Sequence, residues 1–318
     1  ERCVNSILKQ DYPKDLIEII AVDSYSTDGT IESLKNLGVN VVLTKEKYPE
    51  GKGKAKWLGY QKAKNDIVIY TDSDTKLIGA SWIKHMVKPL IEDESISLSI
   101  CRMAILKQDK PINRYLSYIG TDPFLISRSL DPLLALNKLK LIDKGDYFIY
   151  KITTDNFINI GSYCLAAKKK ALDKIGGYTH DVEVSYLLAK NNLGKIAISK
   201  NATIHHLISD SIIRFTKKKY WWANVYFETQ RFNREFTWMP NTLNQKIKLI
   251  LIFVKNFSFI LAAFVGVRMS IKYRELAWLL HPVMVWLTSA SYLLSYIKND
   301  ILKKTRKSDI RTHQVSLS

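Results

Sequence analysis

The chain has 318 residues and a formal net charge of +18. This length allows one large domain or two with a sizeable core, and this charge is typical of proteins that bind a nucleic acid, an anionic membrane surface or an anionic substrate. The three cysteines, Cys3, Cys101 and Cys164, are widely spaced, which argues against a zinc site and a disulfide scaffold and favours core positions or a reducing compartment.

The first hundred residues alternate between strand-like and helix-like segments. The sequence predicts helices over 2–10, from about 28, over 51–64 and over about 79–93, and strands over 17–22, 39–43, 67–71 and about 95–105. Strands that alternate with helices at this spacing predict an α/β fold with a doubly wound, mainly parallel sheet. Residues 110–157 show no clear pattern. The apolar stretch that begins at Phe124 fits either an amphipathic element that contacts a membrane or lipid, or a core segment rich in loops.

Two carboxylates follow one of these predicted strands. The β-branched run Ile67–Thr71 predicts a buried strand, and Asp72 and Asp74 come directly after it. The carboxyl end of a strand in an open α/β sheet is where ligands bind. Because two carboxylates in one place repel each other, they require a cation. The sequence therefore predicts a divalent metal here, bridging a diphosphate.

Two long apolar runs lie near the C-terminus. Leu276–Ile297 contains no Lys, Arg, Asp or Glu, and its length suits a bilayer crossing. Ile247–Val267 is also apolar but contains Lys255, and a charge in the middle of a bilayer costs about 2.5–3.5 kcal/mol. We therefore expect two membrane helices, the first of which either crosses, with Lys255 snorkelling or paired, or lies in the interface. A pair of buried helices in a soluble domain is the alternative.

Five motifs then occur in a characteristic order. They are Val22–Thr30, Asp72-Ser73-Asp74, Gly161–Lys170 with Ile175-Gly176-Gly177-Tyr178, Asp181–Val184, and His205-His206. In this order they resemble the family 2 glycosyltransferases, which have the GT-A fold, over residues 1–235. The resemblance implies a glycosyltransferase domain over 1–235. Together with the apolar runs and the basic C-terminus, we expect two membrane-associated helices over 236–298 and a basic tail over 299–318.

The resemblance implies roles for residues on the donor side. Asp23 would hydrogen-bond the nucleotide base or ribose, although an Asp at this position can also bond its own turn. Lys54 and Lys56 would face the diphosphate, or else lie on a solvated helix face. Asp72 would contact the ribose or the metal, and Asp74 would bind Mn²⁺ or Mg²⁺, unless it only ends a strand.

Further roles concern the acceptor side and the metal. Asp181 would be the general base that takes the proton of the acceptor hydroxyl, with Glu183 as the reserve candidate because His180 stands where the family usually has a Glu. At a helix start, Asp181 could instead be a cap. One histidine of the pair, assigned here to His205, would complete the metal shell, and a buried core histidine is the alternative.

The resemblance also implies a feature that the chain lacks. The first strand of the family ends in an Asn-Glu pair, and Glu1 matches the Glu of that pair, so we expect this central strand to be missing. Its absence would leave open hydrogen-bonding edges in the sheet. Two further departures from the family pattern are Ser24 in place of a frequent Asp and Trp57 in place of a common Asn.

The implied activity is an inverting transfer of a sugar from a nucleoside diphosphate sugar. The apolar runs suggest a membrane-held acceptor, such as a polyprenyl phosphate or a lipid-linked glycan. The basic tail predicts a cell-membrane protein whose catalytic domain faces the cytoplasm. The alternatives are a processive polysaccharide synthase, for which a clear Gln-x-x-Arg-Trp motif is missing, and a degenerate membrane-bound binding module. No nucleic-acid partner is expected, because the basic clusters lie beside apolar runs.

Overall fold

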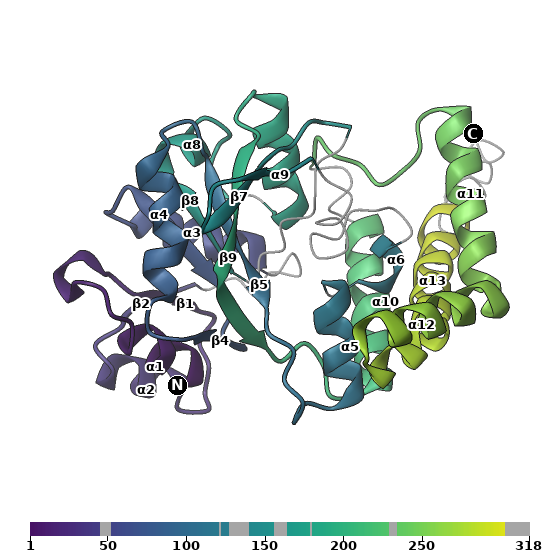
Figure 1. The fold of residues 1–318 in the computed structure, drawn as a ribbon, viewed down its shortest axis with the longest axis horizontal. Helices are drawn as coiled ribbons and strands as arrows, with labels where there is room; N and C mark the ends of the chain where they lie inside the picture. The colour runs from purple at the N-terminus through teal and green to yellow at the C-terminus, as the bar shows by residue number, and fades with distance from the viewer. Residues whose placement is uncertain are drawn as a thin grey trace, which may run out of the picture. The chain divides into compact units, whose positions relative to one another are not determined.

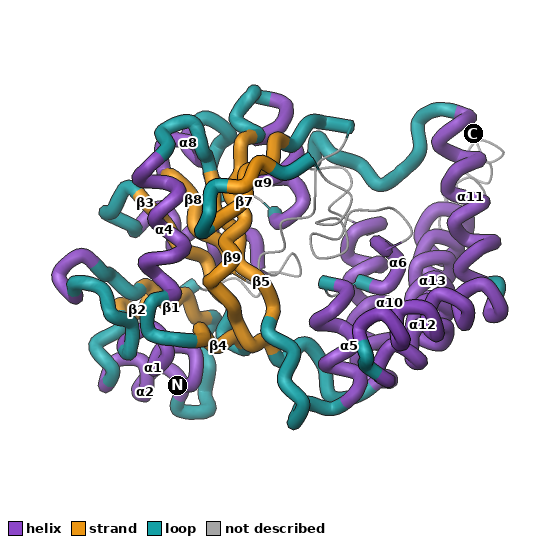
Figure 2. The backbone as a smooth tube through the Cα atoms, viewed as in Figure 1, coloured by secondary structure: helices purple, strands orange, loops and turns teal. Residues whose placement is uncertain are grey.

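The computed structural model shows two compact units. The structure describes residues 1–44, 52–120, 122–126, 140–155, 164–178, 180–228 and 234–302. The first unit is made of the described parts of Glu1–Gln108, Ser117–Gly120 and Ser129–Ile208, and the second of those of Asp109–Leu116, Thr121–Arg128 and Ser209–Ser318. Figure 2 shows that the strands belong to the first unit and that the second is helical.

The first unit contains the elements that the sequence predicts up to residue 103 (Figure 1). Its helices are α1 (Arg2–Leu8), η1 (Lys14–Leu16), α2 (Thr30–Asn36), α3 (Lys52–Lys62), α4 (Trp82–Glu92), α8 (Lys169–Asp173) and α9 (Asp181–Lys190). Its strands are β1 (Ile20–Asp23), β2 (Asn40–Leu43), β3 (Ile67–Thr71), β4 (Thr75–Ile78), β5 (Leu98–Met103), β6 (Ile142–Asp143), β7 (Tyr147–Lys151), β8 (Cys164–Lys168) and β9 (Lys195–His206). Strand β4 is an addition, because the predicted path ran from the carboxylate pair directly into a helix.

The strands form two sheets, and the larger one is mixed rather than mainly parallel as predicted. Strands β1 and β2 pair in parallel, and the larger sheet has the order β3-β8-β5-β9-β7-β6, with β4 also paired to β9. Within it only β5 and β9 run parallel among the described pairs. The difference arises because β8 enters antiparallel between β3 and β5. Among the described strands, β1 pairs only with β2 and β3 only with β8.

Helix α4 covers the core of the larger sheet. Its side chains Trp82, Met86 and Leu90 recur every fourth residue, so they share one helix face, and all three are fully buried. They pack in one cluster with sheet residues that include Met103 and Ile204. The three cysteines are also buried and free of disulfides, which agrees with the prediction of core positions.

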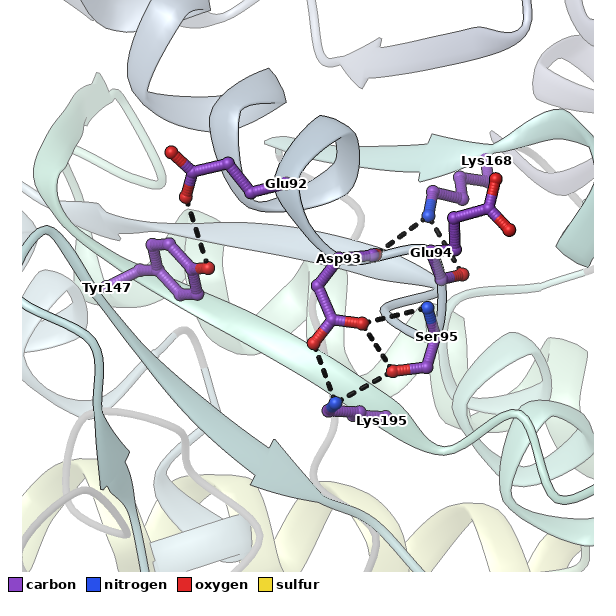
Figure 3. Close-up of polar contacts among 7 residues, drawn as sticks. All are labelled: Glu92, Asp93, Glu94, Ser95, Tyr147, Lys168 and Lys195. Atoms are coloured by element: carbon purple, nitrogen blue, oxygen red, sulfur yellow. Dashed lines mark hydrogen bonds and ion pairs between the residues drawn. The ribbon is translucent and has the colours of Figure 1, made fainter.

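The turn from α4 into β5 is held by lysines from two other strands (Figure 3). The Lys195 ammonium donates to Asp93 Oδ2 at 2.7 Å and to Ser95 Oγ at 2.7 Å. The Lys168 ammonium donates to the main-chain carbonyls of Asp93 and Glu94, each at 2.9 Å. These contacts fix the end of α4 to the first residues of β9 and the last residue of β8.

The second unit is a group of helices. It contains α6 (Pro123–Ile126), α10 (Ile212–Glu228), α11 (Leu243–Phe257), α12 (Phe259–Tyr273), η3 (Leu276–Leu280), α13 (His281–Tyr296) and η4 (Ile297–Leu302), together with the first part of α5 (Pro111–Ile119). Buried polar contacts join them: Asp122 accepts from Lys219 Nζ at 2.9 Å and from the Tyr292 hydroxyl. Helix α10, inside the domain predicted over 1–235, thus packs in the second unit.

The two predicted membrane helices differ in the structure. The run Ile247–Val267 is not one straight helix, since α11 and α12 meet at Ser258 with a bend of 74°. The Ser258 side chain caps α12 by accepting from the Leu261 amide, which explains why a new helix begins there. Among the described helices, Leu276–Ile301 alone is by itself long and apolar enough to cross a membrane, and half of its most apolar 18 residues is buried inside the protein.

Candidate active site

The turn Asp72–Asp74 joins β3 to β4 and is anchored to the end of β9. The Thr75 amide and hydroxyl both donate to the Asp72 carbonyl, at 3.1 and 2.6 Å. The Leu207 amide donates to the Asp74 carbonyl at 3.2 Å. The carboxylate pair is therefore held by main-chain contacts from two directions, at the end of a strand, as its sequence position predicts.

Two carboxylates and one imidazole meet at this turn. One ligand atom each of Asp72, Asp74 and His206 lies within 4.8 Å of the others, and His206 Nε2 is 3.1 Å from Asp74 Oδ1. Hard carboxylate oxygens with one imidazole nitrogen are a donor set that suits Mn²⁺. The residues present therefore fit a divalent metal ion.

The histidine of this group is His206, whereas the sequence analysis assigned His205. In the β4–β9 pairing, Thr75 lies opposite His206 and Lys76 opposite His205. Successive strand residues point to opposite faces of a sheet, so only one of the two histidines can face the carboxylates. The His205 ring instead contacts the guanidinium of Arg2 through Nδ1. A one-residue difference in register, which no local pattern reveals, decides between them.

Lys56 of α3 lies against the same turn. Its ammonium is 3.0 Å from Asp72 Oδ1, and the two side chains are 10% and 6% exposed. The ammonium also lies 5.4 Å from the centre of the Tyr178 ring, which packs against Tyr70 of β3 with ring centres 4.4 Å apart. The structure thus places Lys56 beside Asp72, while its predicted contact with a diphosphate stays a prediction. It also adds Tyr178, which sequence reasoning included only as part of a motif.

A pair of glycines brings Tyr178 into this position. Gly176 and Gly177 have φ angles of +81° and +90°, which residues with a Cβ rarely adopt. A Cβ on Gly177 would lie 3.2 Å from side-chain atoms of Trp57 and Tyr60 on α3. The loop before α9 can therefore approach α3 this closely only because residue 177 is a glycine.

The other two predicted donor-side residues, Asp23 and Lys54, have no described contact with the carboxylate turn. Asp23 ends β1, and its carboxylate accepts from the Ser26 amide at 2.7 Å and from the Ser26 hydroxyl at 2.8 Å. Both oxygens of Asp23 are thus used in its own turn, the alternative that the sequence left open. The main chain of Lys54 belongs to α3, and its side chain lies outside the described residues.

The two candidate bases lie on one helix. Helix α9 begins at Asp181, with His180 as its N-cap residue. The side chain of Asp181 is not among those described, so its distance from the carboxylate turn stays a prediction. Glu183 is 4% exposed, which places its carboxyl group inside the first unit rather than in solvent.

Comparison with a solved structure supports the fold. A mannosyltransferase from Pyrobaculum calidifontis, solved in complex with GDP-Man and Mn²⁺, superposes with a TM-score of 0.51 at 16% sequence identity. The superposition covers 91% of this chain and 81% of that one. At this identity the likeness concerns the fold, which is the GT-A fold of a mixed sheet flanked by helices.

Sequence relatives and a family match complete the assignment. Glucosyl-3-phosphoglycerate synthase of Mycolicibacterium paratuberculosis is 33% identical over 86 residues, 26% of either chain. Poly(ribitol-phosphate) beta-N-acetylglucosaminyltransferase TarS of Staphylococcus aureus is 34% identical over 77 residues, 22% of this chain and 13% of that protein. The matches thus span about a quarter or less of each relative's length. The profile of glycosyl transferase family 2 matches residues 1–176, more than half of the chain, and the chain therefore belongs to this family.

Proposed function

We propose that this protein transfers a sugar from a nucleoside diphosphate sugar to an acceptor hydroxyl, with inversion at the anomeric carbon. The observation that carries the proposal is the convergence of Asp72, Asp74 and His206 at the end of β3, with Lys56 beside them. Acidic and basic groups together suit a diphosphate that arrives with its metal.

The departing diphosphate sets the largest chemical demand. When the sugar–oxygen bond breaks, negative charge grows on the leaving oxygen and must be stabilised. Asp72, Asp74 and His206 would hold Mn²⁺ or Mg²⁺, which when bound supplies this stabilisation. Lys56 adds one further positive charge within the same buried site.

The acceptor hydroxyl must lose its proton as its oxygen attacks the anomeric carbon. We assign this proton to the carboxylate of Asp181 at the start of α9, with Glu183 as the second candidate. The loop that leads into α9 contains Tyr178, which stacks beside Lys56. Asp181 therefore lies three residues after Tyr178 in the sequence, and Tyr178 contacts Lys56 of the proposed donor site.

A membrane-held acceptor accounts for the surface of the second unit. Large apolar side chains are exposed on α11, α12 and α13; they include Ile250, Val254, Ile260, Phe264, Ile271 and Leu294. Exposed basic residues accompany them, among them Lys246, Lys248, Arg268 and Lys272. Such a combination of exposed apolar and basic side chains favours binding to an anionic bilayer. We propose a polyprenyl phosphate or lipid-linked glycan acceptor at the cell membrane, with the catalytic domain on the cytoplasmic side.

Turnover of candidate donors tests the proposed reaction. UDP-glucose and GDP-mannose are incubated with the full chain and Mn²⁺, with and without EDTA, and release of the nucleoside diphosphate is measured. We expect metal-dependent release, and a loss of about a hundredfold or more in Asp74→Asn because the metal is no longer held. Asp11→Asn removes the charge of a solvent-exposed carboxylate and is the control. Normal turnover by Asp74→Asn in Mn²⁺ buffer would contradict the metal's role.

A further inference from the structure

The ion pair between Lys56 and Asp72 includes a member of the candidate metal site. The ammonium lies 3.0 Å from Asp72 Oδ1, and Asp72 is also one of the three members of the metal-binding group. A carboxylate that binds a metal through this oxygen could not keep a lysine at the same contact. Lysine and a metal bound through Oδ1 would therefore compete for that atom.

Burial makes this competition strong. Both side chains are almost completely shielded from solvent, and a buried carboxylate is stable only with an opposite charge beside it. The formal charges of Asp72, Asp74 and Lys56 sum to −1. Lys56 thus cancels part of the negative charge that would attract a divalent cation.

We infer that Lys56 is an exchangeable counter-ion: it neutralises Asp72 before the donor binds and moves to the diphosphate when the metal takes its place. This inference rests on the proposed function. The Lys56 stem belongs to α3, so the ammonium moves by rotation of its side chain while the helix stays in place. In a site of low dielectric constant, the diphosphate offers the displaced ammonium a strong anionic partner. Metal and nucleotide therefore favour each other's binding reciprocally.

Mn²⁺ binding without nucleotide gives a test that is independent of turnover. Free Mn²⁺ is measured by electron paramagnetic resonance during titration of the full chain and of Lys56→Gln. We expect the variant to bind Mn²⁺ alone about tenfold more tightly or better, because a neighbouring positive charge is gone. In saturating Mn²⁺, the same variant should bind UDP or GDP about tenfold more weakly, because the diphosphate loses a charged donor.

Two further variants separate the role of Lys56 from general charge effects. Lys56→Arg keeps the positive charge and should bind Mn²⁺ as the wild type does. Lys84→Gln removes one positive charge from an exposed pair with Asp11 on the same unit and should leave Mn²⁺ binding unchanged.

Thermal unfolding supplies a second readout. Loss of Lys56 removes a positive partner from the buried Asp72 carboxylate, so Lys56→Gln should unfold at a lower temperature in EDTA. Mn²⁺ should then raise its unfolding temperature more than that of the wild type. A variant that folds only with Mn²⁺ present is the extreme form of the same result.

The outcomes distinguish the inference from the proposed function. If the wild type binds Mn²⁺ and Lys56→Gln binds it no more tightly, Lys56 is not a competing counter-ion, and the proposed reaction is unaffected. If the wild type does not bind Mn²⁺ even with UDP or GDP, the metal site itself is wrong, and the inference is overturned with it.

Discussion

At the scale of single residues, the contacts of two adjacent histidines distinguish their proposed roles. His206 Nε2 is 3.1 Å from Asp74, and its neighbour His205 contacts Arg2 instead. Both rings are buried, so burial does not separate them. Their partners do, and on this basis we propose His206 rather than His205 as the metal ligand.

The two histidines form a matched pair of variants. We expect His206→Ala to weaken Mn²⁺ binding in the presence of UDP or GDP by about ten- to hundredfold, because an imidazole ligand is lost. His205→Ala should leave Mn²⁺ binding close to that of the wild type. Isothermal titration calorimetry measures both affinities. The reverse order of effects would mean that the metal uses the other face of β9.

Gly177 is a second residue whose identity decides the local structure. Gly177→Ala combines a left-handed φ angle of +90° with a Cβ only 3.2 Å from Trp57 and Tyr60. Gly38→Ala is its control, because Gly38 has a φ of +73° and no heavy atom within 4 Å of the added Cβ. We expect a loss of about 1–2 kcal/mol for Gly38→Ala from backbone strain alone, and a larger loss for Gly177→Ala. Equal losses in urea unfolding would show that the loop adapts.

At the scale of elements, the turn after α4 shows how charge fixes a connection (Figure 3). The pKa of Asp93 is lowered to about 2, mainly by the hydrogen bond from Lys195 and to a smaller extent by the one from Ser95. The folded-state pKa thus lies below the value of about 3.9 for an unfolded Asp. The resulting stabilisation is complete above that value and is lost as the pH falls towards 2.

The contribution of Asp93 should therefore depend on pH. At pH 7 we expect Asp93→Asn to lower the free energy of unfolding by about 1–2 kcal/mol. Below pH 4 the difference between wild type and variant should shrink, because the carboxylate is then protonated in the unfolded chain while it stays ionised in the folded protein, and the difference should disappear towards pH 2. Urea unfolding at a series of pH values measures this difference. Asp15→Asn changes an exposed carboxylate and is the control. A difference that stays constant down to pH 3 would contradict the assigned cause.

At the scale of the whole molecule, the two units divide the chemical properties. The candidate site belongs entirely to the first unit, whereas the exposed apolar side chains of α11 to α13 belong to the second. The bend of 74° between α11 and α12 gives this surface two helix directions instead of one long span. We propose that this surface contacts the lipid interface, with or without a crossing by Leu276–Ile301.

Vesicle binding tests the role of this surface. Ile250 and Val254 on α11 are 61% and 62% exposed, and the double variant Ile250→Asp, Val254→Asp should weaken binding to phosphatidylcholine–phosphatidylglycerol vesicles by tenfold or more, since each buried apolar side chain contributes about 1.5–3 kcal/mol. Ile91→Asp on α4, where Ile91 is 64% exposed, is the matched control in the first unit. Flotation on a density gradient measures the bound fraction. Equal binding by both variants would exclude α11 from the membrane contact.

The sequence by itself determined the local elements and the position of the carboxylates. Strand 67–71 was predicted with the bounds that β3 has, because β-branched runs report on strand formation locally. The ordered motifs identified the family, because each is a short segment whose chemistry does not depend on distant residues. Strand β4 was missed, since it has only four residues, which lie between the carboxylate turn and the helix predicted from about residue 79.

Tertiary structure alone decided the pairing and the partners. It placed β8 antiparallel between β3 and β5, turned His206 rather than His205 towards Asp74, and set Lys56 on Asp72. It also broke the apolar run at Ser258 into two helices. The physical reason is common to these cases: each depends on register or packing between segments far apart in the chain, and local periodicity carries no information about which segment will be the neighbour.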